Sequence, residues 1–134
     1  MRTTFIYSLV LAALLFVGCE KISTSDNGTL YGTWTVREES ASMNPRTYLA
    51  DIRREPVDTT IVIINNFNNL GSSFELYCRL KDSTLTIFQT NGEIPGYSFS
   101  GNGIYHKSAR LITWVYVVNT NSGSDQVYAR FTRN

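Results

Sequence analysis

Histidine and cysteine, the residues that most often bind zinc or act as nucleophile and base, are few in this sequence and stand far apart. His106 is the only histidine, and the two cysteines are Cys19 and Cys78. Structural zinc sites usually take four Cys, His or carboxylate ligands, and catalytic zinc sites keep three. A zinc site of the usual His or Cys composition would therefore lack ligands, and we predict that His106 is a surface residue at the end of a strand.

Nucleophilic catalysis also lacks its usual motifs. The sequence contains neither a Gly-x-Ser-x-Gly elbow nor a phosphate-binding Gly-Lys-Ser/Thr loop. Cys78 alternates with Phe74, Leu76 and Leu80, a pattern that predicts a buried structural thiol rather than a nucleophile. A Ser-His-Asp arrangement would depend on the single histidine, so hydrolase chemistry is not expected.

Paired carboxylates are the remaining candidates for acid–base work. Glu38 with Glu39, and Glu75 alone, lie on expected strands at positions that alternate with core residues. We interpret all three as members of solvated faces and assign no catalytic residue. The prediction is that the chain is not an enzyme and binds no cofactor.

The strongest signal of the sequence lies at its N-terminus. Arg2 precedes an apolar run over 5–17, which is typical of a secretory signal core. A membrane-spanning helix needs about 20 apolar residues, and this run has only about 13, which makes a span the weaker alternative. The segment Phe16-Val17-Gly18-Cys19 resembles the lipobox of bacterial lipoproteins. That resemblance implies a signal peptide over 1–18 and a diacylglycerol on Cys19; an ordinary signal peptide with a chance cysteine is the alternative.

Two or three acyl chains on Cys19 would anchor the mature protein stably, since each buried CH₂ contributes about 0.8 kcal/mol. We therefore expect a protein of the cell envelope, held on the outer membrane by lipid. Residues 19–30 are rich in Ser, Thr, Asp, Asn and Gly, which predicts a flexible tether. Removal of 18 residues from 134 leaves 116, enough for one domain, which we place at 31–134.

Charge excludes one class of partner. Without Arg2, the mature chain has equal numbers of basic and acidic residues, and no basic stripe is present. Proteins that bind nucleic acid usually carry such a stripe. Nucleic acid is therefore not an expected partner.

From Tyr31 onward, apolar positions recur with a period of two and turn residues interrupt them every eight to twelve positions. This pattern predicts an all-β, eight-stranded antiparallel meander. Asn44-Pro45 could also start a helix, but the alternation that follows favours a strand. Gly101 and Gly103 mark a sharp bend or a close approach of another backbone, as at the corner of a barrel. The expected strands are 32–39, 47–54, 59–67, 73–80, 84–90, 97–106, 111–119 and 125–132.

The segment Gly32-Thr33-Trp34 resembles the Gly-x-Trp signature of lipocalins, members of the calycin superfamily. Segments 66–71 and 97–103 are similar to small lipocalin-like lipoproteins of Bacteroidetes. The resemblance implies a closed lipocalin-like β-barrel on a lipid anchor. It also implies that Trp34 lies against an arginine of the last strand. Strand parity favours Arg133 for this structural closure and makes Arg130, on the outer face, the second choice.

Aromatic side chains are the main candidates for ligand binding, because they combine apolar surface with hydrogen-bonding rims. The alternative is that they merely fill the interior of a small barrel. The strand 111–118 is apolar on both faces, so its outer face, with Leu111, Val115 and Val117, is expected to be covered by something. The candidate ligand-binding residues are Trp34, Tyr97, Phe99, Trp114 and Tyr116.

Two turns resemble a Bacteroidetes O-glycosylation signal, Asp58-Thr59-Thr60 and Asp82-Ser83-Thr84. This resemblance implies glycan acceptors at Thr59 and Ser83.

Together these features predict a membrane-anchored lipoprotein whose barrel binds a small apolar or glycan ligand. The alternative is a non-catalytic structural or interaction subunit of a cell-envelope complex, with an envelope protein as its partner.

Overall fold

The computed structural model describes residues 29–91 and 94–133. The expected signal peptide, Cys19 and most of the expected tether lie outside these residues. Within them, no helix has the length and apolar character needed to cross a membrane.

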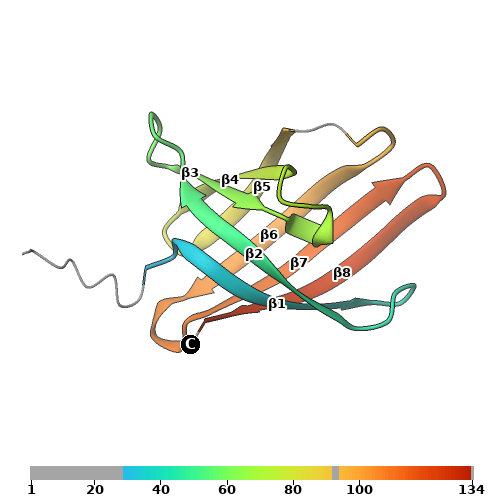
Figure 1. Cartoon of the computed structure of the whole chain (residues 1–134), viewed down its shortest axis with the longest axis horizontal. Coiled ribbons are helices and arrows are strands. Elements are labelled where there is room, and N and C mark those ends of the chain that lie inside the picture. Colours follow the sequence, from blue (N-terminus) through green and yellow to red (C-terminus); the bar gives the residue numbers. More distant parts are fainter. Residues whose placement is uncertain (1–28, 92–93, 134) are drawn as a thin grey trace, which may run out of the picture.

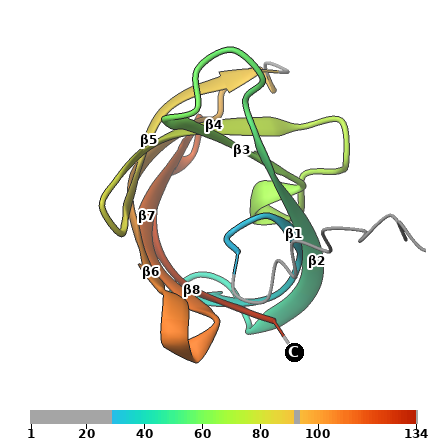
Figure 2. The same cartoon turned by 90° about the vertical axis from the view of Figure 1, so that its left-hand side faces the viewer.

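The described chain forms eight antiparallel strands that close into a barrel (Figures 1 and 2). Strands that follow one another along the chain are neighbours, and the last strand pairs with the first, as the sequence predicts. Two short 3₁₀ helices complete the domain. The elements are β1 (Gly32–Ser40), β2 (Arg46–Arg54), β3 (Ile61–Asn65), η1 (Phe67–Asn69), β4 (Glu75–Lys81), β5 (Thr84–Asn91), β6 (Ser98–His106), η2 (Lys107–Ala109), β7 (Leu111–Thr120) and β8 (Gly123–Thr132).

The third expected strand, 59–67, is longer than the strand observed, since β3 covers only Ile61–Asn65. Three asparagines directly after it, Asn66, Asn68 and Asn69, have positive φ angles and break the ladder. Asparagine adopts the left-handed region more readily than other residues with a side chain. The chain therefore turns into η1, which carries Phe67 into the barrel interior.

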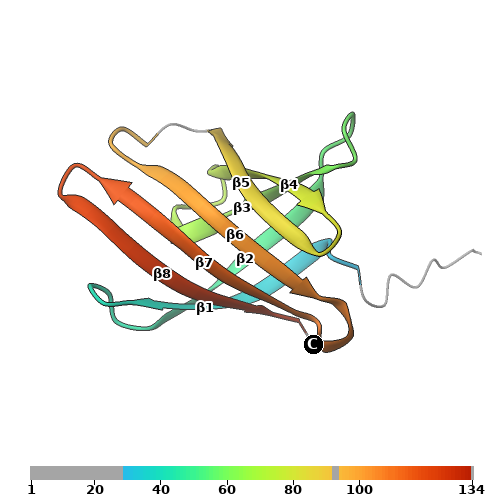
Figure 3. The ribbon, with the colours of Figure 1, turned by 180° about the vertical axis from the view of Figure 1, so that it is seen from behind.

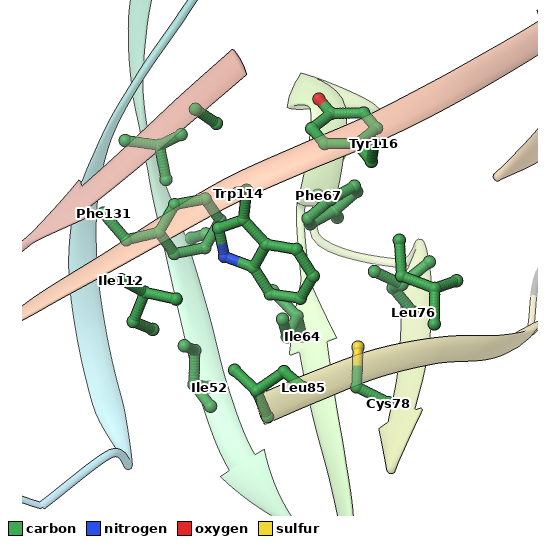
Figure 4. Packing of buried hydrophobic residues seen from close by; sticks show 14 of the residues in the cluster. Ile52, Ile64, Phe67, Leu76, Cys78, Leu85, Ile112, Trp114, Tyr116 and Phe131 are labelled. Atoms are coloured by element: carbon green, nitrogen blue, oxygen red, sulfur yellow. The ribbon is translucent and has the colours of Figure 1, made fainter. Parts of the chain in front are cut away.

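The interior of the barrel is packed with side chains (Figure 4). Phe67 is fully buried, and its ring centroid lies 4.6 Å from that of Tyr116 and 5.4 Å from that of Trp114. Such aromatic pairs contribute about 0.5–1.5 kcal/mol each beyond area burial. The alternation predicted for β7 is confirmed, because Ile112, Trp114, Tyr116 and Val118 all point inward.

Gly103 is required by this packing. A Cβ built on Gly103 would lie 2.6 Å from the Trp114 ring, closer than any real contact. Gly101 has φ +143°, and a Cβ there would lie 2.4 Å from the backbone oxygen of Val115. The predicted close approach of another backbone to β6 is therefore confirmed.

The closing strands bring the two ends of the domain together. Thr35 of β1 pairs with Thr132 of β8. Trp34 directly precedes Thr35, and Arg133 directly follows Thr132, so these two residues lie at the same end of the barrel. The Trp34 indole is buried, and its Nε1 donates to the Leu30 carbonyl at 2.9 Å. Arg133 Nη1 donates to the carbonyls of Thr29, at 3.1 Å, and Tyr31, at 2.5 Å.

These contacts tie the segment before β1 across one end of the barrel, here called the closed end. Leu30 belongs to the core at 5% exposure, so packing begins one residue before the expected boundary. The guanidinium partners shown for Arg133 are backbone carbonyls, and its stacking on the Trp34 indole stays a prediction. Arg130 is exposed on the outer face, as its parity predicts.

Candidate functional site

A cavity of about 390 Å³, with both polar and apolar groups in its wall, lies at the end of the barrel opposite the closed end, here called the mouth. Because the strands form a meander, four connections meet at the mouth: β1–β2, β3–β4 with η1, β5–β6 and β7–β8. The β7–β8 hairpin supplies seven of the twelve lining residues. The lining residues are Ser42, Met43, Arg46, Asn68, Tyr97, Val118, Thr120, Ser122, Gly123, Ser124, Asp125 and Val127.

A buried carboxylate lies next to this cavity. Glu38 is only 1% exposed, so its predicted place on a solvated face is wrong. The reason is strand parity: Glu38 follows Trp34 and Val36 at intervals of two, and all three point inward. Glu39 lies on the outer face and is exposed, as predicted.

The Glu38 carboxylate is fully paired. Its Oε1 accepts from Arg46 Nε at 2.6 Å, and Arg46 Nη2 forms an ion pair with the same oxygen. Its Oε2 accepts from the hydroxyls of Tyr48, at 2.9 Å, and Tyr116, at 2.8 Å. Asn68 extends the network, since its Nδ2 donates to the Tyr116 hydroxyl at 2.8 Å. A buried charge is tolerated only with such complete pairing.

The two tyrosines of this network are held as neutral donors. Burial raises the pKa of Tyr48 and of Tyr116 far above the ordinary value, and the nearby Glu38 charge raises both further. Each phenol therefore keeps its proton and can donate only to a fixed acceptor. The network is a rigid support rather than a proton-transfer chain.

Arg46 connects this support to the cavity. Its side chain is 33% exposed and lines the mouth, while Nη2 also donates to the Asn68 carbonyl at 2.7 Å. Among the described residues, Arg46 Nη1 makes no hydrogen bond. Since Nε and Nη2 are both held, the guanidinium has one orientation, and Nη1 is the nitrogen left to bind a ligand.

Asp125 supplies a negative charge elsewhere on the wall. Its Oδ2 accepts from the hydroxyls of Ser40 and Ser42, both at 2.5 Å, and these hydrogen bonds lower the pKa of Asp125. Asp125 is therefore ionised at neutral pH. The cavity offers one guanidinium, one carboxylate and several hydroxyl groups.

Of the five candidate ligand-binding residues, Tyr97 alone lines the cavity. Tyr97 lines the cavity at 42% exposure, and its ring stacks on that of Phe99 with centroids 6.4 Å apart. Tyr116 supports the cavity through Glu38. Trp34 and Trp114 do not line the cavity; both are 1% exposed and belong to the core.

Sequence reasoning missed Glu38, Arg46, Asn68 and Asp125. Strand parity was the available signal, because it places Glu38, Arg46 and Asp125 on the inward faces of β1, β2 and β8. Asn68 lies in η1, where no periodicity marks it.

The remaining candidates lie away from the mouth. Cys78 is buried, as predicted, and burial raises the pKa of its thiol. His106 is exposed at the end of β6, as predicted, with its Nε2 3.1 Å from Thr113 Oγ1. Thr59 and Ser83 are exposed in turns. In the described part of the chain, no three His, Cys, Asp or Glu side chains gather into a possible metal site.

Comparison with known proteins finds no family model and no curated protein that matches this chain.

Proposed function

We propose that this protein is a non-catalytic, lipid-anchored binding module whose barrel mouth holds a small glycan. The observation that carries the proposal is the cavity of about 390 Å³, lined by polar and apolar groups, at the mouth of a barrel whose interior is packed. A cavity of this volume falls within the range of small-molecule sites, about 300–1,000 Å³.

The packed interior disfavours an apolar ligand inside the barrel. Phe67 reaches the centre from η1 and contacts aromatic rings of β6, β7 and β8. A lipocalin-type cup would need this space to be empty. The ligand is therefore assigned to the mouth, outside the layer formed by Phe67.

The chemistry of the wall favours a sugar over other small polar molecules. Sugars present many hydroxyl groups, which can both donate to Asp125 and accept from Arg46 Nη1. The exposed ring of Tyr97 offers an apolar face for the C–H side of a pyranose. The support beneath Arg46 preorganises that guanidinium, which lowers the entropy lost on binding.

The position of the mouth agrees with an anchor at Cys19. Residues Thr29–Tyr31 are held at the closed end by Arg133 and Trp34. A tether that starts at a lipidated Cys19 would therefore reach the domain at the end away from the mouth. The mouth would then face away from the membrane, where a glycan can enter it.

A glycan array of mono- to tetrasaccharides, followed by NMR titration with the best-bound sugar, tests the proposal. We expect binding by the mature protein and a loss of at least tenfold in affinity for Asp125→Asn and for Tyr97→Ala. Asp51→Asn, an exposed outer-face aspartate, is the matched control and is expected to bind normally. The proposal fails if no sugar binds, or if both mouth variants bind as well as the control.

The second candidate is an interaction subunit of an envelope complex. It is favoured by two apolar side chains that remain exposed on the outer face, Val115 at 45% and Tyr128 at 54%. Native mass spectrometry of protein purified from its own membranes distinguishes the candidates, because a retained sugar and a retained protein subunit differ in mass. A bound subunit without sugar would favour this second candidate.

A further inference from the structure

The outer face of β1, β8 and β7, which lie side by side in Figure 3, carries a groove, and the volume of this groove is about 220 Å³. Of these three strands, β8 lies in the middle. Val115 and Tyr128 are direct cross-strand partners and form an exposed apolar row. The groove is separate from the mouth, with which it shares no lining residue.

Two arginines on neighbouring strands line this groove. Arg37 of β1 and Arg130 of β8 are direct cross-strand partners, and both are exposed. Neither forms an ion pair with a described residue. Like charges directly opposite each other destabilise a sheet, so this pair has a cost in the isolated domain. An anion bound between the two guanidiniums would remove that cost.

The apolar row indicates that the anion has an apolar part. Val115 and Tyr128 lie one row from the arginine pair on the same face, because Glu39, Tyr128 and Val115 are aligned across β1, β8 and β7. A free inorganic anion would leave this row exposed. The groove is also smaller than the roughly 300 Å³ of a complete small-molecule site, so it fits part of a larger amphiphile.

Phosphate suits the arginine pair better than carboxylate does. A phosphate group presents its oxygens on a tetrahedral centre, so guanidiniums from two strands can approach different oxygens. A carboxylate has two oxygens in one plane and is usually satisfied by one arginine. Glu39 lines the same groove and leaves a net charge of about +1 there. The Glu39 carboxylate gives a cationic group beside the phosphate a partner of opposite charge.

We propose that this groove binds the zwitterionic headgroup of a phospholipid of the phosphatidylethanolamine type. Its phosphate lies between Arg37 and Arg130, its ammonium group lies near Glu39, and the start of its acyl region covers Val115 and Tyr128. The site is independent of the mouth and of any glycan bound there.

Calorimetric or NMR titration with dihexanoyl phosphatidylethanolamine, below its micelle concentration, tests the site. The mature chain with Cys19→Ser is used, so that its own lipid does not compete. We expect the double variant Arg37→Gln/Arg130→Gln to bind at least tenfold more weakly. Arg79→Gln, another exposed arginine on a strand, is the matched control and is expected to bind as the parent does. Thermal denaturation of each variant confirms that it folds.

Two further probes identify the headgroup. Dihexanoyl phosphatidylglycerol and inorganic phosphate are expected to bind more weakly than the ethanolamine lipid, and Glu39→Gln is expected to reduce the preference for ethanolamine at least threefold. Asp125→Asn, at the mouth, is expected to leave lipid binding unchanged. The proposal is overturned if the parent does not bind the ethanolamine lipid, if the double variant binds equally well, or if inorganic phosphate alone binds as tightly. A dimer of the parent that dissociates in the double variant would assign the face to a second copy of the chain instead.

Discussion

The hydroxyl of Tyr116 donates a hydrogen bond of 2.8 Å to the carboxylate of Glu38, a residue 78 positions earlier in the chain. Glu38 lies on β1 and Tyr116 on β7, and both are almost completely buried. This bond connects the support beneath Arg46 to the packed aromatic interior. It makes the geometry of the mouth depend on the folded barrel as a whole.

The first prediction concerns the buried carboxylate. Glu38→Gln keeps the shape of the side chain but removes the charge that balances Arg46. Loss of one partner of a buried ion pair costs about 3–5 kcal/mol, and partial exposure of Arg46 places this case near 3 kcal/mol. Urea denaturation measures the change in the free energy of unfolding. Glu39→Gln, the exposed neighbour, serves as control and is expected to change it by less than about 0.5 kcal/mol. Equal effects of the two substitutions would show that Glu38 is not buried as a charge.

The second prediction concerns alkaline pH. Burial and Glu38 raise the pKa of Tyr48 and Tyr116 in the folded protein above the unfolded value of about 10. A raised folded-state pKa gives stability that is fully present below pH 10 and is lost as the pH rises above it, because the unfolded chain then releases protons that the folded chain retains.

A spectrophotometric titration of phenolate formation measures this effect. Two tyrosines are expected to ionise only when the protein unfolds, as followed in parallel by circular dichroism. Tyr116→Phe is expected to remove one of these late transitions. Ionisation of every tyrosine while the barrel remains folded would contradict the buried network.

The third prediction concerns Cys78. Its side chain is fully buried, and burial raises the pKa of the thiol, so neither access nor thiolate is available in the folded state. A thiol reagent such as dithionitrobenzoate is expected to label Cys78 of the Cys19→Ser protein only in denaturant. Labelling within seconds in native buffer would argue against this burial.

The fourth prediction concerns the anchor. Cys19→Ser removes the thiol that would receive lipid, so the mature domain is expected to leave the membrane fraction. Fractionation after a high-salt wash measures this, with Cys78→Ala as the control that retains the attachment. A Cys19→Ser protein that stays tightly bound to membranes after the wash would rule out lipid on Cys19 as the anchor.

The fifth prediction concerns glycosylation. Thr59 and Ser83 are exposed in turns, where a transferase could reach them. If both are acceptors, protein from its native host is heavier than the lipidated polypeptide, and Thr59→Ala and Ser83→Ala each remove part of the difference. Intact mass spectrometry measures it. A mass without any sugar increment would refute both sites.

The barrel itself could be predicted from the sequence. Alternation of apolar and polar residues is a local property. It places Ile112 and Trp114 on the same face of β7, whichever strands lie beside β7. Short polar turns then leave few ways to connect the strands. The end of β3 was harder to place. The strand ends because Asn66, Asn68 and Asn69 adopt positive φ angles, and asparagine takes such angles only in particular turns.

The candidate site was decided by the tertiary structure. Parity places Glu38 inside, but a buried carboxylate is stable only with partners, and those partners come from β2 and β7. Arg46 and Tyr48 belong to the second strand and Tyr116 to the seventh. The β1–β2 hairpin pairs Glu38 directly with Arg46, whereas only the folded barrel brings Tyr116 within hydrogen-bond distance of Glu38. The sequence by itself thus determined which residues point inward, since the period of a strand is local. Only the closed barrel decided that β1 and β7 meet through Glu38 and Tyr116, since that depends on the packing of strands distant in the chain.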